Sequence, residues 1–291
     1  MALKLGRDRD AALPHEQRVA MRALVAAPKF ELIPLKNALG VAALLPDRAS
    51  VTVTASPSHG IESTVELAEQ LAASGHDAVP HLSAHMIRDR AHLGDLLDRC
   101  RVAGFREAFV VGGDAQDPGD FHDGLALLRA MHEVGHPFES IGAPGYPEGH
   151  ADIADERLVE VLLDKQPFLS YMATQMCFNP GAITRWIAEM RRRDVLLPVH
   201  LGTPGVADLT KLMTISARIG IADSARYLKK NKRMVGKLLT PGKFGPDALL
   251  EGMAPALADP SANITSLHLF TFNQVGATVE WQQRMLATLD G

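Results

Sequence analysis

Short apolar runs alternate with longer amphipathic segments along most of the chain. The runs are rich in Val, Leu, Ile and Phe and have the length of buried strands, whereas the segments between them repeat apolar residues every three or four positions, as helices do. The expected strands cover 29–34, 50–56, 77–83, 107–113, 140–146, 168–176, 196–202 and 266–272. Eight strands that alternate with helices predict an α/β protein with a parallel sheet.

The segments between the strands carry the end signals of helices. We expect a leading helix over 14–26 and further helices over 61–75, 89–104, 119–135 and 180–193. Several of these segments end in Gly, which readily adopts the backbone conformation that follows a last helical turn, and Pro180 suits a first turn. These signals support the alternation of strands and helices.

The order of elements favours a closed barrel over an open, doubly wound sheet. The chain has 291 residues, and single (βα)8 barrels are typically about 250 residues long. The stretch "VVGGDA" (110–115) lacks the third glycine of a dinucleotide fingerprint and the Lys-Ser/Thr of a P-loop, so we interpret it as a tight turn near a ligand. We therefore predict one (βα)8 TIM barrel over 1–291, with an N-terminal helical extension (1–28) and a helical insert (206–257) before the last strand.

Composition narrows the class of protein and of partner. The formal net charge is -4 and the pI is about 6.3, which gives no long-range attraction for nucleic acid or an anionic membrane. The two cysteines, Cys100 and Cys177, indicate reduced thiols and a cytoplasmic setting. We also expect no signal peptide or membrane helix, because no long uninterrupted apolar run occurs. A homo-oligomer is expected from base rates alone.

Polar residues gather where the predicted strands end. In a (βα)8 enzyme, the chemistry lies at the C-terminal ends of the strands. Glu31 is the least expected of these residues, because it lies between Phe30 and Leu32 and an isolated buried carboxylate is costly. The others, in strand order, are Thr54, Ser56, His81, His85, Asp114, Tyr146, Glu148, His150, Gln175, His200, Asn273 and Gln274. Each has a structural explanation when taken alone, but together they favour a site.

A metal centre is one alternative for these residues. His81, His85, His150 and His200, with Asp114, offer nitrogen and oxygen ligands. His81 and His85 are four residues apart but begin in a strand, where they would lie about 13 Å apart, and no H-E-x-x-H spacing occurs. A metal-dependent hydrolase or lyase stays an alternative that metal analysis would decide.

Several short motifs resemble the methylenetetrahydrofolate reductase family in its short, catalytic-domain form. They are "FELIP", "VTAS", "PHL", "GGD", "YPEGH", "TQMCF" and the C-terminal "LHLFTFNQ". The resemblance implies a (βα)8 barrel and an oxidoreductase that interconverts 5,10-methylene- and 5-methyltetrahydrofolate in one-carbon and methionine metabolism. It also implies bound FAD, which NADH or NADPH reduces.

The resemblance implies roles for individual residues. Glu31 matches the general acid that protonates N10 of the folate, and partial removal of a carboxylic acid from water favours its protonated form. Asp114 matches an aspartate between pterin and flavin, and Gln175 matches a glutamine that contacts the folate ring. The matching flavin positions are Thr54, His81, Asp114, Tyr146, His150 and Lys165, and Gln274 completes the folate set.

The chain departs from the family pattern at three places. Gly112 stands where an arginine is usual, "TKLMT" (210–214) offers no aromatic platform for a folded NADH, and Gln274 stands where an arginine is common. These departures leave open a flavin-independent reductase in which NADH passes hydride directly to the folate. A non-enzymatic folate-binding protein is disfavoured, because binding alone gives no reason to bury an acid.

Overall fold

The computed structural model describes residues 13–113, 118–208, 210, 212 and 243–291. Its eight parallel strands close into a barrel in the order β1-β10-β7-β6-β5-β4-β3-β2. The strands are β1 Lys29–Leu32, β2 Ser50–Val53, β3 Asp77–Ser83, β4 Glu107–Val111, β5 Ser140–Gly145, β6 Tyr171–Thr174, β7 Val199–Pro204 and β10 Ile264–Phe270. Each overlaps one of the eight predicted strands, so the predicted (βα)8 barrel is confirmed.

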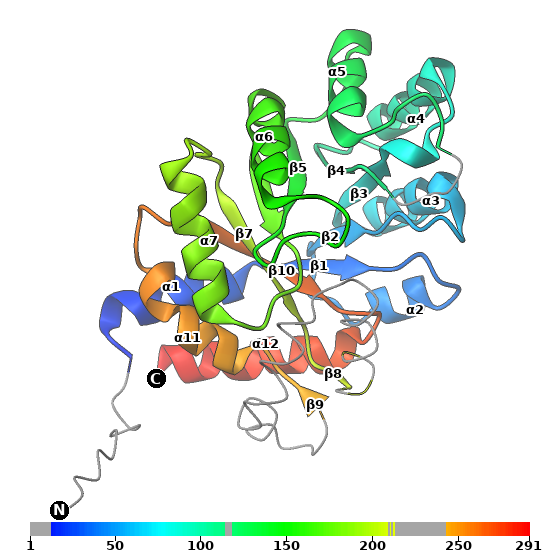
Figure 1. Ribbon diagram of the computed structural model, residues 1–291. Helices are drawn as coiled ribbons and strands as arrows, with labels where there is room; N and C mark the ends of the chain where they lie inside the picture. The colour runs from blue at the N-terminus through cyan, green and yellow to red at the C-terminus, as the bar shows by residue number, and fades with distance from the viewer. Residues whose placement is uncertain (1–12, 114–117, 209, 211, 213–242) are drawn as a thin grey trace, which may run out of the picture.

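Helices surround the barrel (Figure 1). They are α1 His15–Ala26, α2 Ala38–Ala42, α3 Gly60–Ala73, α4 Arg90–Val102, α5 Gly124–Val134, α6 Asp155–Lys165, α7 Pro180–Arg192, α11 Asp247–Leu257 and α12 Val275–Asp290, with short 3-10 turns at Ala84–Met86 and Gln166–Phe168.

Side chains cap several of these helices. Asp89 accepts a hydrogen bond from the His92 amide at the start of α4 (2.8 Å), and Asp123 accepts one from the Ala126 amide at the start of α5 (2.9 Å).

The N-terminal helix is part of the fold rather than a loose extension. Helix α1 packs against α11 and α12 beside the barrel (Figure 1). The buried Gln282 side chain of α12 donates a hydrogen bond to the Val25 carbonyl of α1 (2.9 Å), and Met21 and Val25 are almost completely buried. The last helix therefore packs against the first described helix.

The region predicted as a helical insert is only partly helical where it is described. Ala207–Asp208 (β8) pairs antiparallel with Lys243–Phe244 (β9), and α11 follows. The prediction missed this small sheet because two-residue strands are too short to show an apolar pattern. Residues 213–242 lie outside the described residues, as do residues 1–12 of the predicted extension.

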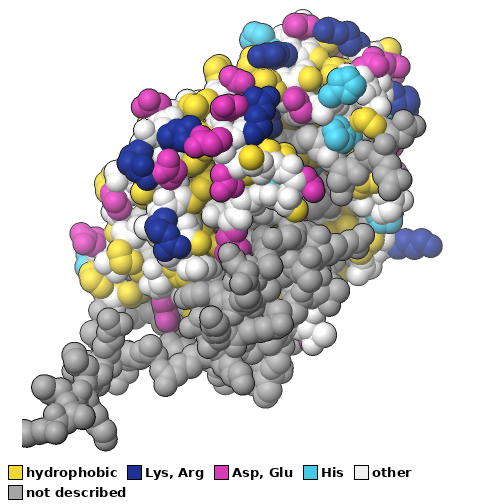
Figure 2. Space-filling view, in the orientation of Figure 1, with side chains coloured by type: hydrophobic (Ala, Val, Ile, Leu, Met, Phe, Trp, Pro, Cys, Tyr) yellow, Lys and Arg dark blue, Asp and Glu magenta, His cyan; other side chains and the backbone are white. Residues whose placement is uncertain are grey.

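The surface carries charges of both signs. Figure 2 shows Lys and Arg side chains interspersed with Asp and Glu over the face in view, in keeping with the small net charge of -4. In the described part of the chain, none of the helices has the length and apolar character needed to cross a membrane.

The inside of the barrel is unusually polar. At its N-terminal end, the Lys29 ammonium lies 2.5 and 2.6 Å from the two carboxylate oxygens of Glu107, and we call these residues the floor pair. Above them, the rings of Tyr171 and His200 stack at 3.7 Å between centroids. Burial lowers the pKa of His200 to about 2, and Lys29 contributes to this shift. A barrel interior normally holds layers of branched apolar side chains, so these polar groups call for a chemical explanation.

Candidate active site

Strand alternation turns Glu31 into the barrel. Phe30 and Leu32 are buried on the other side of β1, at 1% and 0% exposure, because successive side chains of a strand point to opposite faces. The side chain of Glu31 is 14% exposed, and its backbone carbonyl accepts a hydrogen bond from the Thr271 hydroxyl (2.6 Å). The acid therefore lies inside the barrel, near the C-terminal end of β1.

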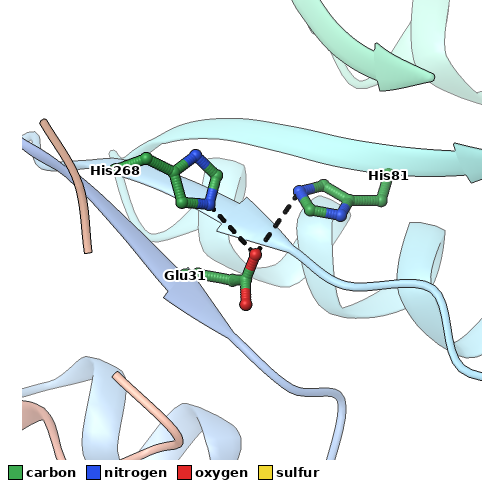
Figure 3. Close-up of side chains that lie close together, drawn as sticks. All are labelled: Glu31, His81 and His268. Carbon is green, nitrogen blue, oxygen red and sulfur yellow. Dashed lines mark hydrogen bonds and ion pairs between the residues drawn. The ribbon is translucent and has the colours of Figure 1, made fainter. Parts of the chain in front are cut away.

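Two buried histidines face this carboxylate (Figure 3). His268 Nε2, from β10, lies 3.0 Å from Glu31 Oε2, and His81 Nε2, from β3, lies 4.0 Å from the same oxygen. We call Glu31, His81 and His268 the Glu31 cluster. Among the described residues, neither a lysine nor an arginine forms an ion pair with Glu31.

The environment of His81 keeps its ring neutral. Burial lowers the pKa of His81 to about 4, although the nearby Glu31 opposes the shift. The ring packs against Phe109 with centroids 4.7 Å apart, and Nε2 has no hydrogen-bond partner within the described structure. At neutral pH, His81 therefore offers the cluster an uncharged imidazole.

A large cavity opens at the C-terminal ends of β4 and β5 and continues between α6 and α7. Its volume is about 1270 Å³, which is more than most small-molecule sites require. At the barrel end it is lined by Ser83, Gly112, Gly113 and Gly145, and farther out by Tyr146, His150, Lys165 and Trp186. The cavity suits an elongated ligand of dinucleotide size.

The glycine turn after β4 brings backbone to the edge of this cavity. Gly113 has a φ of +97°, and a Cβ placed there would lie 2.2 Å from the Ser83 hydroxyl oxygen. Any other residue would therefore both strain the turn and collide with β3. This is the tight βα turn expected from "VVGGDA", as far as the described residues reach.

Lys165 gives the cavity a half-buried positive charge. Burial lowers the pKa of Lys165, and the nearby Asp123 partly opposes that shift. Its ammonium lies at the start of α5, where a Cβ on Gly124 would be 3.2 Å from Nζ. None of the described residues forms an ion pair with it. The Asp123 carboxylate already caps the N-terminus of α5, so the Lys165 ammonium is the group in this part of the cavity that could contact an anion such as phosphate.

The structure gathers the predicted flavin positions only in part. Tyr146, His150 and Lys165 line the cavity, and the rings of Tyr146 and His150 meet edge to face at 5.3 Å. His81 instead belongs to the Glu31 cluster. Thr54 is not among the residues lining the cavity. Its backbone carbonyl accepts a hydrogen bond from the Thr64 hydroxyl (2.9 Å). Asp114 lies outside the described residues.

The predicted folate positions follow the ends of β6 and β10. The backbone N–H of Gln175 donates a hydrogen bond to the Gly145 carbonyl (2.8 Å), which fixes the turn after β6. Gln274 directly precedes helix α12, at its N-cap position. Neither side chain is among the residues lining the large cavity.

Two residues of the site had no assigned role in the sequence. His268 alternates with the buried Leu267 and Leu269, and this period of two could have placed it inside the barrel. Asn273 fixes the chain just after Glu31, because its side chain accepts a hydrogen bond from the Ile33 amide (2.9 Å) and donates one to the Ile33 carbonyl (3.0 Å). Both residues hold the acid in place.

The four histidines of the alternative metal set do not come together in the structure, and its fifth member, Asp114, lies outside the described residues. His85 Nε2 lies 2.9 Å from the His122 carbonyl, His150 lies beside Tyr146, and His200 stacks on Tyr171. A different group of residues has ligand atoms close enough together to bind one metal ion. The ligand atoms of Glu31, His81 and His268 all lie within 4.8 Å of one another.

The fold and the site together define an enzyme-like (βα)8 barrel with an acid and two imidazoles inside it. Solved structures with similar folds include an oxaloacetate acetylhydrolase bound to oxalate, with 10% identity, a TM-score of 0.51 and coverage of 95% of this chain and 88% of that one. Another is a Toxoplasma gondii protein described as a deoxyribose-phosphate aldolase, with 9% identity, a TM-score of 0.50 and coverage of 94% and 98%. At this identity they show the fold alone.

The sequence itself matches the family model of methylenetetrahydrofolate reductase over residues 35–285. This range covers most of the chain, which therefore belongs to the methylenetetrahydrofolate reductase family. The resemblance drawn from the short motifs is confirmed. The match begins after Glu31, so the role of that residue depends on its geometry and on the "FELIP" motif.

Proposed function

We propose that this protein interconverts 5,10-methylenetetrahydrofolate and 5-methyltetrahydrofolate, with bound FAD as the hydride carrier and NADH or NADPH as the electron donor. Family membership supports the reaction. The observation that carries the proposal is the Glu31 carboxyl, held by His268 at 3.0 Å inside the barrel. The enzyme would serve one-carbon and methionine metabolism in the cytoplasm.

Glu31 is the proposed general acid. Its proton passes to N10 of methylenetetrahydrofolate, the bond between N10 and the bridging carbon breaks, and the substrate becomes an N5 iminium ion. Hydride addition to that carbon then gives the methyl group. In the reverse direction, the carboxylate takes the proton back from N10. A positioned acid of this kind typically accelerates such a step by about 10²–10⁴-fold.

The cavity fits FAD by its size. Tyr146 and His150 are suitable neighbours for its aromatic rings, and the Lys165 ammonium is suited to its pyrophosphate. Thr54, His81 and Asp114 are assigned to flavin by the family resemblance. When bound there, FAD would supply and accept the hydride. Gln175, Gln274 and Asp114 are the proposed folate contacts.

A second candidate is direct hydride transfer from NADH without flavin. The observation that favours it is Gly112, which lines the cavity where the family usually has an arginine. Without that side chain, one contact to a phosphate or flavin is lost and the space it would fill stays open. The substrate and the role of Glu31 are the same in both candidates.

The visible spectrum of the untreated, purified protein separates these candidates. The FAD proposal predicts a flavin absorbance band that bleaches when 5-methyltetrahydrofolate is added without oxygen. A colourless protein that nevertheless oxidises NADH with methylenetetrahydrofolate would support direct transfer. A protein that turns over neither folate with any pyridine nucleotide, even after added FAD, would contradict the proposed function.

A further inference from the structure

The Glu31 cluster has a feature that proton transfer does not use. Both imidazoles direct Nε2 toward the same carboxylate oxygen (Figure 3). The Nε2 atom of His81 has no hydrogen-bond partner among the described residues. His81 and His268 are 6% and 1% exposed. Two buried nitrogens and one oxygen that converge from three strands are a ligand set for a metal ion.

We propose that the Glu31 cluster is a binding site for a divalent transition-metal ion of the zinc type, and that its occupation blocks folate turnover. The binding depends only on the three side chains. The inhibition rests on the proposed function, because it requires Glu31 to be the proton donor.

The geometry is close to that of a zinc site. Bonds of about 2.0–2.2 Å place neighbouring ligand atoms of a tetrahedral zinc ion about 3.4 Å apart. His268 Nε2 and Glu31 Oε2 are 3.0 Å apart, His81 Nε2 and the same oxygen are 4.0 Å apart, and no pair of ligand atoms exceeds 4.8 Å. A shift of about 1 Å in side-chain position would therefore close the site.

The ligand types select among metals. Two imidazoles and one carboxylate favour zinc and its neighbours in the transition series, whereas magnesium and calcium prefer oxygen ligands alone. Three protein ligands leave a fourth tetrahedral position, which water occupies in sites of this kind. The proposed ion is therefore held by three protein ligands and one exchangeable ligand.

The surroundings indicate modest affinity. The Phe109 ring lies against both imidazoles, with centroids 4.7 Å from His81 and 6.0 Å from His268, and thus limits their rotation. However, His268 Nδ1 has no hydrogen-bond partner among the described residues. Ligand histidines almost always have such a partner, and its loss weakens metal binding about 10–100-fold. We therefore expect micromolar rather than nanomolar binding of zinc.

Metal binding and acid catalysis exclude each other at this carboxyl. When the ion binds the carboxylate, the proton of Glu31 leaves to solvent and the lone pairs of both imidazoles are engaged. No proton is then available for N10 of the folate. Transfer of hydride from NADH to an artificial acceptor needs no such proton and should continue.

The binding test uses the full-length protein, stripped of metal with a chelator that is then removed. Calorimetric titration with zinc chloride should show one site per chain, and cobalt chloride should give the visible absorption of a tetrahedral ion. His81→Ala and His268→Ala should each weaken zinc binding by at least about tenfold. His15→Ala removes an exposed histidine of α1 and should bind zinc like the wild type. Circular dichroism checks that each variant is folded.

The inhibition test compares two activities at increasing zinc. Folate turnover should fall as zinc fills the site, while NADH oxidation with a quinone acceptor should persist. Addition of a chelator should restore folate turnover. Absence of a zinc site, or unchanged affinity in folded His81→Ala and His268→Ala proteins, would overturn the inference. Zinc binding without any folate turnover would instead contradict the proposed function and leave the metal site intact. Zinc-dependent stimulation of turnover would overturn the inhibitory role.

Discussion

Glu107 and Glu31 both direct a carboxylate into the barrel, but their partners are very different. Glu107 at the floor is paired with Lys29 through two contacts of 2.5 and 2.6 Å. Glu31, two residues farther along β1 than Lys29, faces two imidazoles instead, at 3.0 and 4.0 Å. The floor pair joins two opposite charges at the start of two strands, so it has a structural role. Glu31 faces two imidazoles and forms no ion pair with a lysine or arginine among the described residues, and this position suits a residue that transfers a proton.

The largest effect should come from breaking the floor pair. Lys29→Met leaves Glu107 without its cation at a position where its side chain is only 20% exposed, and loss of one partner of a buried pair typically costs about 3–5 kcal/mol of folding free energy. Urea unfolding should show this loss. Lys29→Met combined with Glu107→Leu should recover most of it, whereas equal stability of the single variant and the wild type would show that the pair is not structural.

Glu31→Gln should affect activity far more than stability. The amide keeps the shape of the side chain but cannot protonate N10, so folate turnover should fall by about 100-fold or more, which corresponds to about 2.7 kcal/mol. Initial rates with methylenetetrahydrofolate measure the effect. A folded variant with wild-type turnover would remove Glu31 from the mechanism.

Acid should destabilise the fold through its buried histidines. His200 has a pKa of about 2 in the folded protein against 6.5 for an exposed histidine, so between these values the unfolded chain binds more protons. The stability that depends on neutral His200 is therefore fully present well above pH 6.5, and it is lost progressively as the pH falls below this value. Between pH 7 and pH 5, His200 should account for about 2 kcal/mol.

His200→Phe tests this dependence, because it keeps a ring to stack on Tyr171 but removes the titrating group. Urea unfolding at pH 7 and pH 5 should show a smaller acid loss in the variant than in the wild type. The same acid loss in both proteins would assign the pH dependence to other groups.

The smallest effect should come from Asn273→Ala. The change removes the two hydrogen bonds to Ile33, at 2.9 and 3.0 Å, and should lower stability by about 1 kcal/mol. Ile33 lies two residues after Glu31 in the chain, so loss of these hydrogen bonds should also misplace the Glu31 carboxyl. Folate turnover should therefore fall by about tenfold. Asp89→Ala, which removes the cap of α4, should cost similar stability with normal turnover. Equal turnover in both variants would exclude a positioning role for Asn273.

The sequence predicted the barrel well because each strand carries its own signal. Phe30 and Leu32, or Val51 and Val53, are apolar and almost completely buried, and a short apolar run of this kind can be read from each strand without reference to the others. The β8 and β9 pair left no such signal, since it consists of two short segments far apart in the sequence. The closure of α12 onto α1 also depends on contacts that no local pattern encodes.

The site could be predicted only in part. Which residues meet there depends on the direction of their side chains inside the barrel. Glu31 stood out as an acid in an apolar strand, and Tyr146, His150 and Lys165 were expected from the motifs and do line one cavity. The resemblance assigns His81 to flavin but does not predict its contact with Glu31 at 4.0 Å, and it assigns no role to His268. The contact between Glu31 and His268 joins residues 237 positions apart, a distance over which spacing in the sequence gives no information.

The two half-reactions of Glu31→Gln, followed by rapid mixing, test the central claim most directly. The protein is first reduced with NADH and then mixed with methylenetetrahydrofolate without oxygen. We predict wild-type reduction by NADH, followed by hydride transfer to the folate that is at least about 100-fold slower than in the wild type. Transfer to the folate at the wild-type rate would show that the carboxyl between His81 and His268 is not the acid of this reaction.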